Sequence, residues 1–429
     1  MQLRERLSVA AQMAMAGALM AVERVESGAV WNPLSRSYRV NPYPAYRRLR
    51  ERDPFHRSRA ARAWVLTRHA DVTSVLRDPR FLADDRKVPR LRKQLEQRVE
   101  RGYVTREEAD RNTMLRTDPP DHTRLRSLVS KAFTPRSVEA LRPRIEQIVD
   151  ELLDAAAKHD RIDVIRELAY PLPVIVIAEM LGIPPADREQ FKRWSDDLAA
   201  QLGFGNDLET LRRGRAAGQA LRAYLEPILE ARRREPREDL ISGLVAAHDE
   251  GDRLTEDEVF STITLLLVAG NETTTNLIGN GLLALLGHPD QLDMLRWDPD
   301  LMPNAVEELL RYDSPVQATS RVVLEDVDVN GHAVRAGDEL FLLMGAANRD
   351  PEAFARPEEL DVTRQDIRHL SFGHGIHYCL GAPLARIEAP VALNALIQRF
   401  PDMRLATSDR AWGDNIILRG LKELPVVLR

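Results

Sequence analysis

The sequence predicts a mainly α-helical protein with small β-sheets, and three observations support this fold class. Long segments rich in Ala, Leu, Arg and Glu repeat their apolar residues at helical spacing, over about residues 136–160, 186–233, 239–250 and 256–287. Strand signals are short and local. Strands and helices do not alternate regularly along the chain, which argues against a doubly wound parallel sheet.

The helix expected over 256–287 is the most informative of these elements. Thr255 and Glu258 form a capping-box pattern at its start, and the sequence GHP ends it near Leu286. At about 1.5 Å per residue it is roughly 45 Å long, enough to cross a whole domain. Its middle, ITLLLVAG, is apolar on every face, so we expect it to be buried.

The β signals predict small patches of sheet. AWVLT at 63–67 is a strand candidate, and the pair Asn330-Gly331 between alternating β-formers predicts a tight hairpin. The C-terminal segments MRLA and IILRGLKELPVVL predict a further small sheet. Residues 84–117 and 345–378 lack clear periodicity, and we expect both to be irregular.

Composition narrows the class of protein. The 429 residues carry a net charge of −5, which gives no bulk attraction to nucleic acid. The single cysteine excludes an internal disulfide framework and fits a reducing, cytoplasmic compartment. The apolar run 7–22 is too short to span a bilayer. We expect one domain over 1–429, with a helical extension over 1–40 that packs on the body or a partner; a weak membrane or export signal is the alternative.

The only cysteine, Cys379, lies in the glycine-rich stretch SFGHGIHYCLG at 371–381. Four interpretations are open. Cys379 could be structural, a nucleophile activated by His377, a zinc ligand with His369, His374 and His377, or a thiolate ligand of haem iron. A haem thiolate needs backbone N–H donors and the positive end of a following helix. The glycines allow backbone N–H groups to come close to the sulfur, and the segment after Gly381 predicts a helix that starts just past the cysteine.

The stretch FGHGIHYCLG resembles the haem-binding signature of the cytochrome P-450 family, F-x-x-G-x-x-x-C-x-G, at Phe372, Gly375, Cys379 and Gly381. Three further motifs stand in the family's order, so the resemblance covers about residues 40–429. It implies the triangular-prism-like P-450 fold and haem b, with Cys379 as the axial ligand and Phe372 and Gly381 beside the cofactor. The form of the signature is similar to that of soluble bacterial members.

A second motif, AGNETTT at 269–275, lies inside the long helix. Taken alone, its threonines would bond back to carbonyls one turn earlier and only bend the helix. The resemblance implies the oxygen-activation motif. Ala269 would then lie beside the haem, and Gly270 would open a groove for dioxygen. Thr273 would hydrogen-bond the activated oxygen, and Glu272 would relay protons from solvent.

Two further motifs carry ion-pair patterns. In EELLR, Glu308 and Arg311 lie three residues apart, which alone suggests an ordinary surface pair. The resemblance implies the family's E-x-x-R, completed by Arg364 into a structural triad that fixes the cysteine loop. In DPPDHTRLRS, His122 and Arg126 share one face of a helix, which alone suggests a solvated surface. The resemblance implies haem propionate contacts, shared with Arg321 and His377.

Substrate contacts rest on family position alone. The pocket is expected to be lined from region 84–117 and by Leu267, Val316, Ala318, Thr319, Ile416 and Ile417. These residues are mostly apolar, so we expect a hydrophobic small molecule as substrate. The sequence does not name the compound, and His374 has no assigned role.

The resemblance implies a haem-thiolate monooxygenase that inserts one oxygen atom of O2 by hydroxylation or epoxidation. The sequence shows no flavin or nicotinamide fingerprint, so a ferredoxin or flavodoxin with its reductase is expected to supply electrons. Docking is expected on the face near Cys379, at Lys131, Arg356, Arg368 and Arg386. The alternatives are an H2O2-driven peroxygenase, which GNET opposes, a non-catalytic haem-binding protein and a cysteine hydrolase. We expect a monomer that binds neither membrane nor nucleic acid.

Overall fold

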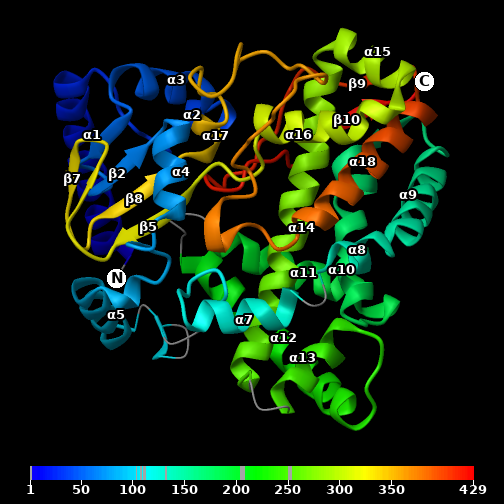
Figure 1. The fold of residues 1–429 in the computed structure, drawn as a ribbon, viewed down its shortest axis with the longest axis horizontal. Coiled ribbons are helices and arrows are strands. Elements are labelled where there is room, and N and C mark those ends of the chain that lie inside the picture. The colour runs from blue at the N-terminus through cyan, green and yellow to red at the C-terminus, as the bar shows by residue number, and fades with distance from the viewer. Residues whose placement is uncertain are drawn as a thin grey trace.

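The computed structural model describes residues 2–102, 104–106, 109, 113–130, 133–202, 208–249 and 254–429. Helices dominate it (Figure 1). They are α1 (Gln2–Ser27), α2 (Arg36–Val40), α3 (Tyr43–Arg52), α4 (His69–Arg77), α5 (Pro89–Glu100), α7 (Asp121–Ser130), α8 (Pro135–Glu139), α9 (Arg142–Ala156), α10 (Pro171–Met180), α11 (Arg188–Ala199), α12 (Leu208–Arg234), α13 (Leu240–Asp249), α14 (Glu256–Leu286), α15 (Pro289–Trp297), α16 (Met302–Tyr312), α17 (Met344–Ala347) and α18 (Ala382–Arg399).

The strands form small sheets, as predicted. The largest has the order β1-β2-β8-β5-β3, and it mixes antiparallel pairs with one parallel pair between β2 and β8. The β6–β7 hairpin turns at Asn330 and Gly331, whose φ values of 52° and 87° match a tight primed turn. The strands are β1 (Phe55–Ser58), β2 (Ala63–Leu66), β3 (Phe81–Leu82), β4 (Arg161–Asp163), β5 (Thr319–Val323), β6 (Val327–Val329), β7 (His332–Val334), β8 (Glu339–Leu342), β9 (Arg404–Leu405) and β10 (Pro425–Val427).

Helix α14 runs through the middle of the helical part of the molecule (Figure 1). Its predicted capping box is present: Glu258 N–H donates to Thr255 Oγ1 at 3.2 Å, and Thr255 N–H donates to Glu258 Oε2 at 2.8 Å. It packs against helices α10, α11, α13, α15, α16 and α18. Most of its middle is buried, as expected, and Ala269 marks its exposed face.

Region 84–117 is not irregular throughout, because α5 occupies residues 89–100. Leu91, Leu95 and Val99 recur every fourth residue and are half-buried, while the charged residues between them are exposed. So narrow an apolar stripe is a weak helical signal in a densely charged segment. Residues 103, 107–108 and 110–112 of this region lie outside the described part.

The C-terminal end of α1 is fixed to the body by a buried carboxylate. Glu23 accepts hydrogen bonds from the backbone N–H groups of Arg59 and Ala60, at 2.5 and 3.0 Å. His56 Nε2 lies 3.3 Å from the same carboxyl group. Within the described residues, no helix combines the length and the apolarity needed to cross a membrane.

Candidate active site

The cysteine loop is a tight turn placed against helix α4. Gly373 and Gly375 adopt φ values of 71° and 72°, a region that side chains with a Cβ rarely occupy. A Cβ at Gly375 would also collide with the carbonyl oxygen of Leu76. Cys379 N–H donates to the carbonyl of Phe372 at 2.8 Å and closes the turn, and α18 begins three residues later. These positions accept only glycine, and they bring Cys379 to the start of a helix.

Burial by the surrounding protein raises the pKa of the Cys379 thiol. The backbone N–H groups of Gly381 and Ala382, and the charges of Arg126 and Arg386, act in the opposite direction. Arg126 also donates to the carbonyl of Tyr378 at 2.7 Å, which ties α7 to the loop. A bound cation would complete the deprotonation of this sulfur.

The four predicted propionate partners converge near this loop. The rings of His122 and His377 lie 4.3 Å apart. Burial, then the neighbouring charges of His377 and Arg126, lower the pKa of His122 to about 4. Burial also lowers the pKa of Arg321 to about 10. Burial therefore disfavours the charged form of both side chains, and the charge of Asp118 opposes this shift at each of them.

Asp118 is an acid that the sequence reasoning missed. Its carboxylate accepts hydrogen bonds from the backbone N–H groups of Ala83 and Asp84, at 3.1 and 2.9 Å, and lies 3.7 Å from Nε2 of His377. Burial opposes its ionisation, but these contacts together lower the pKa of Asp118 to about 2. The position one turn before His122 was the available sequence signal. Asp118 therefore places a negative charge beside His377.

These residues fit haem b. Its two propionate carboxylates would meet a buried cluster of basic groups, in which Nε2 of His122 and of His377 has no hydrogen-bond partner among the described residues. Its iron would meet the Cys379 sulfur, a ligand that donates electron density to the metal. Gly381 leaves open space where a Cβ would lie, so the backbone beside Cys379 can approach a flat ring closely.

Part of the AGNETTT motif lies on the exposed face of α14, whereas Asn271, Thr274 and Thr275 are buried. Ala269 is exposed, Thr273 is half-buried, and a Cβ added at Gly270 would meet no described residue outside its own helix turn within 4 Å. Thr273 Oγ1 donates to the carbonyl of Ala269 at 2.7 Å, the local bond that a helical threonine commonly makes. Burial, and then the charge of Asp196, raise the pKa of Glu272 to about 7. An acid with this pKa can both take up and release a proton near neutral pH.

The structure brings the predicted triad together as a buried ion-pair network. Arg311 donates to Glu308 at 2.7 and 2.8 Å, and Arg364 donates to the same carboxylate at 3.0 Å. Glu308 and Arg311 are fully buried, so the surface-pair interpretation of EELLR is wrong. Arg364 also donates to the carbonyls of Ala355 and Arg356, in the long loop before Cys379.

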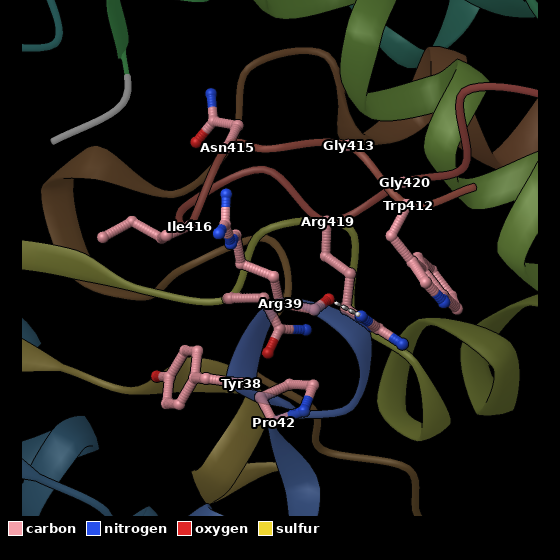
Figure 2. Close-up of a pocket in the computed structure, with 10 residues that line it drawn as sticks. Tyr38, Arg39, Pro42, Trp412, Gly413, Asn415, Ile416, Arg419 and Gly420 are labelled. Carbon is pink, nitrogen blue, oxygen red and sulfur yellow. Dashed lines mark hydrogen bonds between the residues drawn. The ribbon is translucent and has the colours of Figure 1, made fainter. Parts of the chain in front are cut away.

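The residues predicted to line the substrate pocket fall into two groups. Val316 forms a β-bridge with Leu418, and Gln317 N–H donates to the Ile417 carbonyl at 2.7 Å, so the segments around 316–319 and 416–417 lie together. Leu267 instead is fully buried in the core. Ile416 reaches a cavity of about 10 Å³ beside α2, shown in Figure 2 with Tyr38 and Arg39. That cavity holds at most a water molecule.

His374 has a clear position. Its Nε2 lies 2.8 Å from Nη2 of Arg77, and its Nδ1 accepts from the N–H of Gly375 at 2.6 Å. His369 meets Glu307 at 3.1 Å instead. Among the described residues, no group of three or more His, Cys, Asp or Glu side chains is placed to hold a metal ion. The proposed zinc ligands therefore do not converge, and His374 joins the cysteine loop to α4.

Comparison with known proteins identifies the family to which the chain belongs. The family model described as Cytochrome P450 matches residues 90–300 and 300–404. The chain belongs to the cytochrome P450 family. It is 46% identical to Cytochrome P450 CYP107DY1 of Priestia megaterium over 85% of this chain and 89% of that one. It is 44% identical to Cytochrome P450 monooxygenase PikC of Streptomyces venezuelae, over 92% of both chains.

Solved structures agree with this assignment. The P450 superposes on the cytochrome P450 PksS of Bacillus subtilis 168 with a TM-score of 0.84 and 41% identity, over 93% of this chain and 100% of that one. The predicted mainly α fold with small sheets is confirmed. The chain is thus a haem-dependent P450 monooxygenase, an oxidoreductase that inserts one oxygen atom of dioxygen into a small-molecule substrate. The peroxygenase and non-catalytic alternatives are not favoured.

Proposed function

We propose that in this P450 Cys379 is the axial ligand, that Glu272 and Thr273 deliver protons, and that a ferredoxin or flavodoxin with its reductase supplies electrons. The observation that carries the proposal is the convergence of Cys379, His122, His377 and Arg126 at one place, through the 4.3 Å ring contact and the Arg126–Tyr378 hydrogen bond. A thiolate and a set of cations are what an iron porphyrin dicarboxylate requires.

The roles follow from the chemistry of each group. The haem, when bound, activates dioxygen with two electrons and two protons. Glu272 is suited to proton delivery because its pKa of about 7 lies near neutral pH. Thr273 adjoins it and carries a hydroxyl that can accept a proton from one side and donate one to the other. Gly270 leaves room beside that hydroxyl. His122, Arg126, Arg321 and His377 hold the propionates.

The substrate is proposed to be a hydrophobic small molecule. Of the apolar residues proposed to line the pocket, Ala318 is buried, and Val316, Ile416 and Ile417 are half-buried. An apolar lining favours a substrate whose reacting carbon lies on a hydrocarbon surface. Thr319 supplies one hydroxyl for orientation. We propose a monomeric, cytoplasmic protein with one P450 domain over residues 1–429.

The electron donor is proposed to dock on the face that carries the cysteine loop. Ile376 and Tyr378 are 49% and 38% exposed there, an apolar centre that a protein partner could cover. Arg386 lies beside Tyr378, which it bonds at 3.0 Å, and Arg356 and Arg368 are exposed. Cations at the rim favour an acidic electron carrier. The fourth predicted cation, Lys131, lies outside the described residues.

Replacing Thr273 tests the proton-delivery proposal. In Thr273→Ala the second proton should arrive late, so more of the electrons consumed should leave as hydrogen peroxide and fewer as oxidised product. Thr264→Ala is the matched control, because Thr264 makes the same bond to a carbonyl one turn earlier, at 2.8 Å to Phe260, on the same helix. Equal peroxide release in Thr273→Ala and the native protein would contradict the proposal.

A further inference from the structure

Glu307 on α16 and Arg386 on α18 form an ion pair beside the cysteine loop. Arg386 donates two parallel hydrogen bonds to the Glu307 carboxylate, from Nε at 2.7 Å and from Nη2 at 2.9 Å. The two side chains are 38% and 24% exposed, so water screens the pair only in part. Glu308, the next residue, belongs to the buried triad. Neighbouring carboxylates of α16 therefore bind two different cations.

The Arg386 guanidinium also contacts the cysteine loop on both sides of Cys379's own hydrogen bond. It lies over the Phe372 ring, 4.6 Å from the ring centre, and it donates from Nη1 to the Tyr378 hydroxyl at 3.0 Å. Tyr378 precedes Cys379 in sequence, and Phe372 supplies the carbonyl that accepts the Cys379 N–H. Arg386 thus holds the residue before the cysteine and the residue that closes its turn.

His369 adds a hydrogen bond to this pair but no charge. Its Nδ1 accepts from the Ser371 N–H at 3.1 Å, so that nitrogen carries no proton. The proton of the ring must then be on Nε2, which lies 3.1 Å from Glu307 and donates to it. Burial opposes the ionisation of Glu307, but the hydrogen bonds from Arg386 and His369 lower its pKa to about 2. Near neutral pH the group therefore holds one negative and one positive charge.

These two charges act on electron transfer in opposite directions. Reduction of a thiolate-bound haem iron adds one negative charge to the site behind Cys379. A nearby positive charge stabilises the reduced state, and a nearby negative charge destabilises it. Burial raises the pKa of the Cys379 thiol, and the charge of Arg386 is among the groups that oppose this rise, so its electrostatic effect reaches the sulfur.

We propose that the Glu307–Arg386 pair holds the cysteine loop and sets the reduction potential of the haem. Neither side chain touches the reacting atoms, so both are positioning residues. The electron comes from the ferredoxin or flavodoxin proposed above, and no bond or proton of the pair changes when it arrives. The inference rests on the proposed role of Cys379 as the axial ligand.

The test is a spectroscopic redox titration of the haem-loaded protein without substrate. Glu307→Gln keeps the size of the side chain and removes the negative charge, so the midpoint potential should rise. Arg386→Met removes the positive charge, so the potential should fall. We expect each change to alter the equilibrium constant for one-electron reduction at least about threefold, which is about 30 mV at about 59 mV per tenfold. Loosening of the loop alone would shift both variants in the same direction.

The ion pair of Arg144 and Glu179 is the matched control. It joins α9 to α10 through two hydrogen bonds, at 2.8 and 3.0 Å, and its side chains are 37% and 28% exposed. Arg144→Met and Glu179→Gln should keep the native potential. The inference is overturned if Glu307→Gln and Arg386→Met shift the potential in the same direction or not at all, or if the control variants shift it equally.

Further measurements keep the inference testable and separate it from the proposed function. If Arg386→Met does not bind haem, Glu307→Gln decides alone, and only a rise in potential supports the inference. The carbon monoxide spectrum of the native protein tests the ligand itself. A red-shifted Soret band with unshifted potentials in the variants means that only the inference fails. A native protein without the red shift means that the proposed role of Cys379 fails, and the inference with it.

Discussion

Arg311 donates two parallel hydrogen bonds to the carboxylate of Glu308, at 2.7 and 2.8 Å, with neither side chain exposed. Its other donors reach the carbonyls of Asn348, Pro357 and Glu359, at 2.8–3.0 Å. Helix α16 is thereby joined to the long loop that leads to Cys379. A pair this deeply buried stabilises the fold only while each charge keeps its oppositely charged partner and each N–H group keeps an acceptor.

Removing Glu308 should therefore be strongly destabilising. Glu308→Ala leaves the guanidinium groups of Arg311 and Arg364 buried without their carboxylate, at an expected loss of about 3–5 kcal/mol in the free energy of unfolding. Urea unfolding of the haem-loaded protein measures it. Glu359→Ala is the control, because the Arg356–Glu359 pair has the same spacing but is 66% and 59% exposed. That variant should lose less than about 1 kcal/mol. Similar losses of unfolding free energy in Glu308→Ala and Glu359→Ala would contradict this prediction.

Glu388 predicts how stability depends on pH. It is fully buried in α18, and burial raises its pKa to about 8 despite a hydrogen bond with Thr274. Between its ordinary pKa of 4.5 and about 8, the folded protein holds a proton here that the unfolded chain releases. Stability should therefore be lost as pH rises through this window, by about 1.4 kcal/mol per pH unit.

Glu388→Gln should remove that contribution. From about pH 6 to about pH 8 the native protein should lose about 2–3 kcal/mol more unfolding free energy than the variant does. Urea unfolding at a series of pH values measures the difference. Glu423→Gln, at an exposed position, should keep the native slope. The prediction is wrong if Glu388→Gln loses stability with pH as steeply as the native protein.

Arg321 should control how firmly the haem is held. Its guanidinium is buried, and burial lowers the pKa of this group to about 10 because the charged form loses its hydration. A propionate carboxylate beside the guanidinium would offset that cost. Arg321→Met keeps the volume of the side chain and removes the charge. We expect haem to pass from this variant to an excess of apomyoglobin at least about tenfold faster, which is about 1.4 kcal/mol. Arg335→Met, on an exposed turn, should release haem at the native rate; equal rates would contradict the propionate role.

The sequence predicted best where one local pattern determines the structure. The capping box of Thr255 and Glu258 and the Asn330-Gly331 turn both formed as expected, because each depends on neighbouring residues alone. The resemblance located Glu308, Arg311 and Arg364, although no local pattern could show that a loop arginine would meet the helix. The helix that begins after Gly381 was also predicted correctly, because the start of a helix has its own sequence signals.

What the sequence could not show are contacts between distant segments. Helices α12 and α13 lie between Asp196 and Glu272 in the sequence. The sequence around either acid therefore gives no sign that the charge of Asp196 raises the pKa of Glu272. The contact of His374 with Arg77 and that of Asp118 with His377 have the same origin. Helix α5 was missed for another reason. It has only three apolar residues among many charged ones, and so narrow an apolar stripe is a weak signal for a helix.

The most direct test of the central claim is the spectrum of the reduced, haem-loaded protein under carbon monoxide. Axial ligation by the Cys379 thiolate predicts a red-shifted Soret band. Cys379→Ser, which keeps the geometry of the loop but not the soft sulfur ligand, should lose that band while the fold is retained. A native protein that is folded and haem-loaded yet shows no red shift, or a Cys379→Ser variant that keeps it, would contradict the assignment of Cys379 as the ligand.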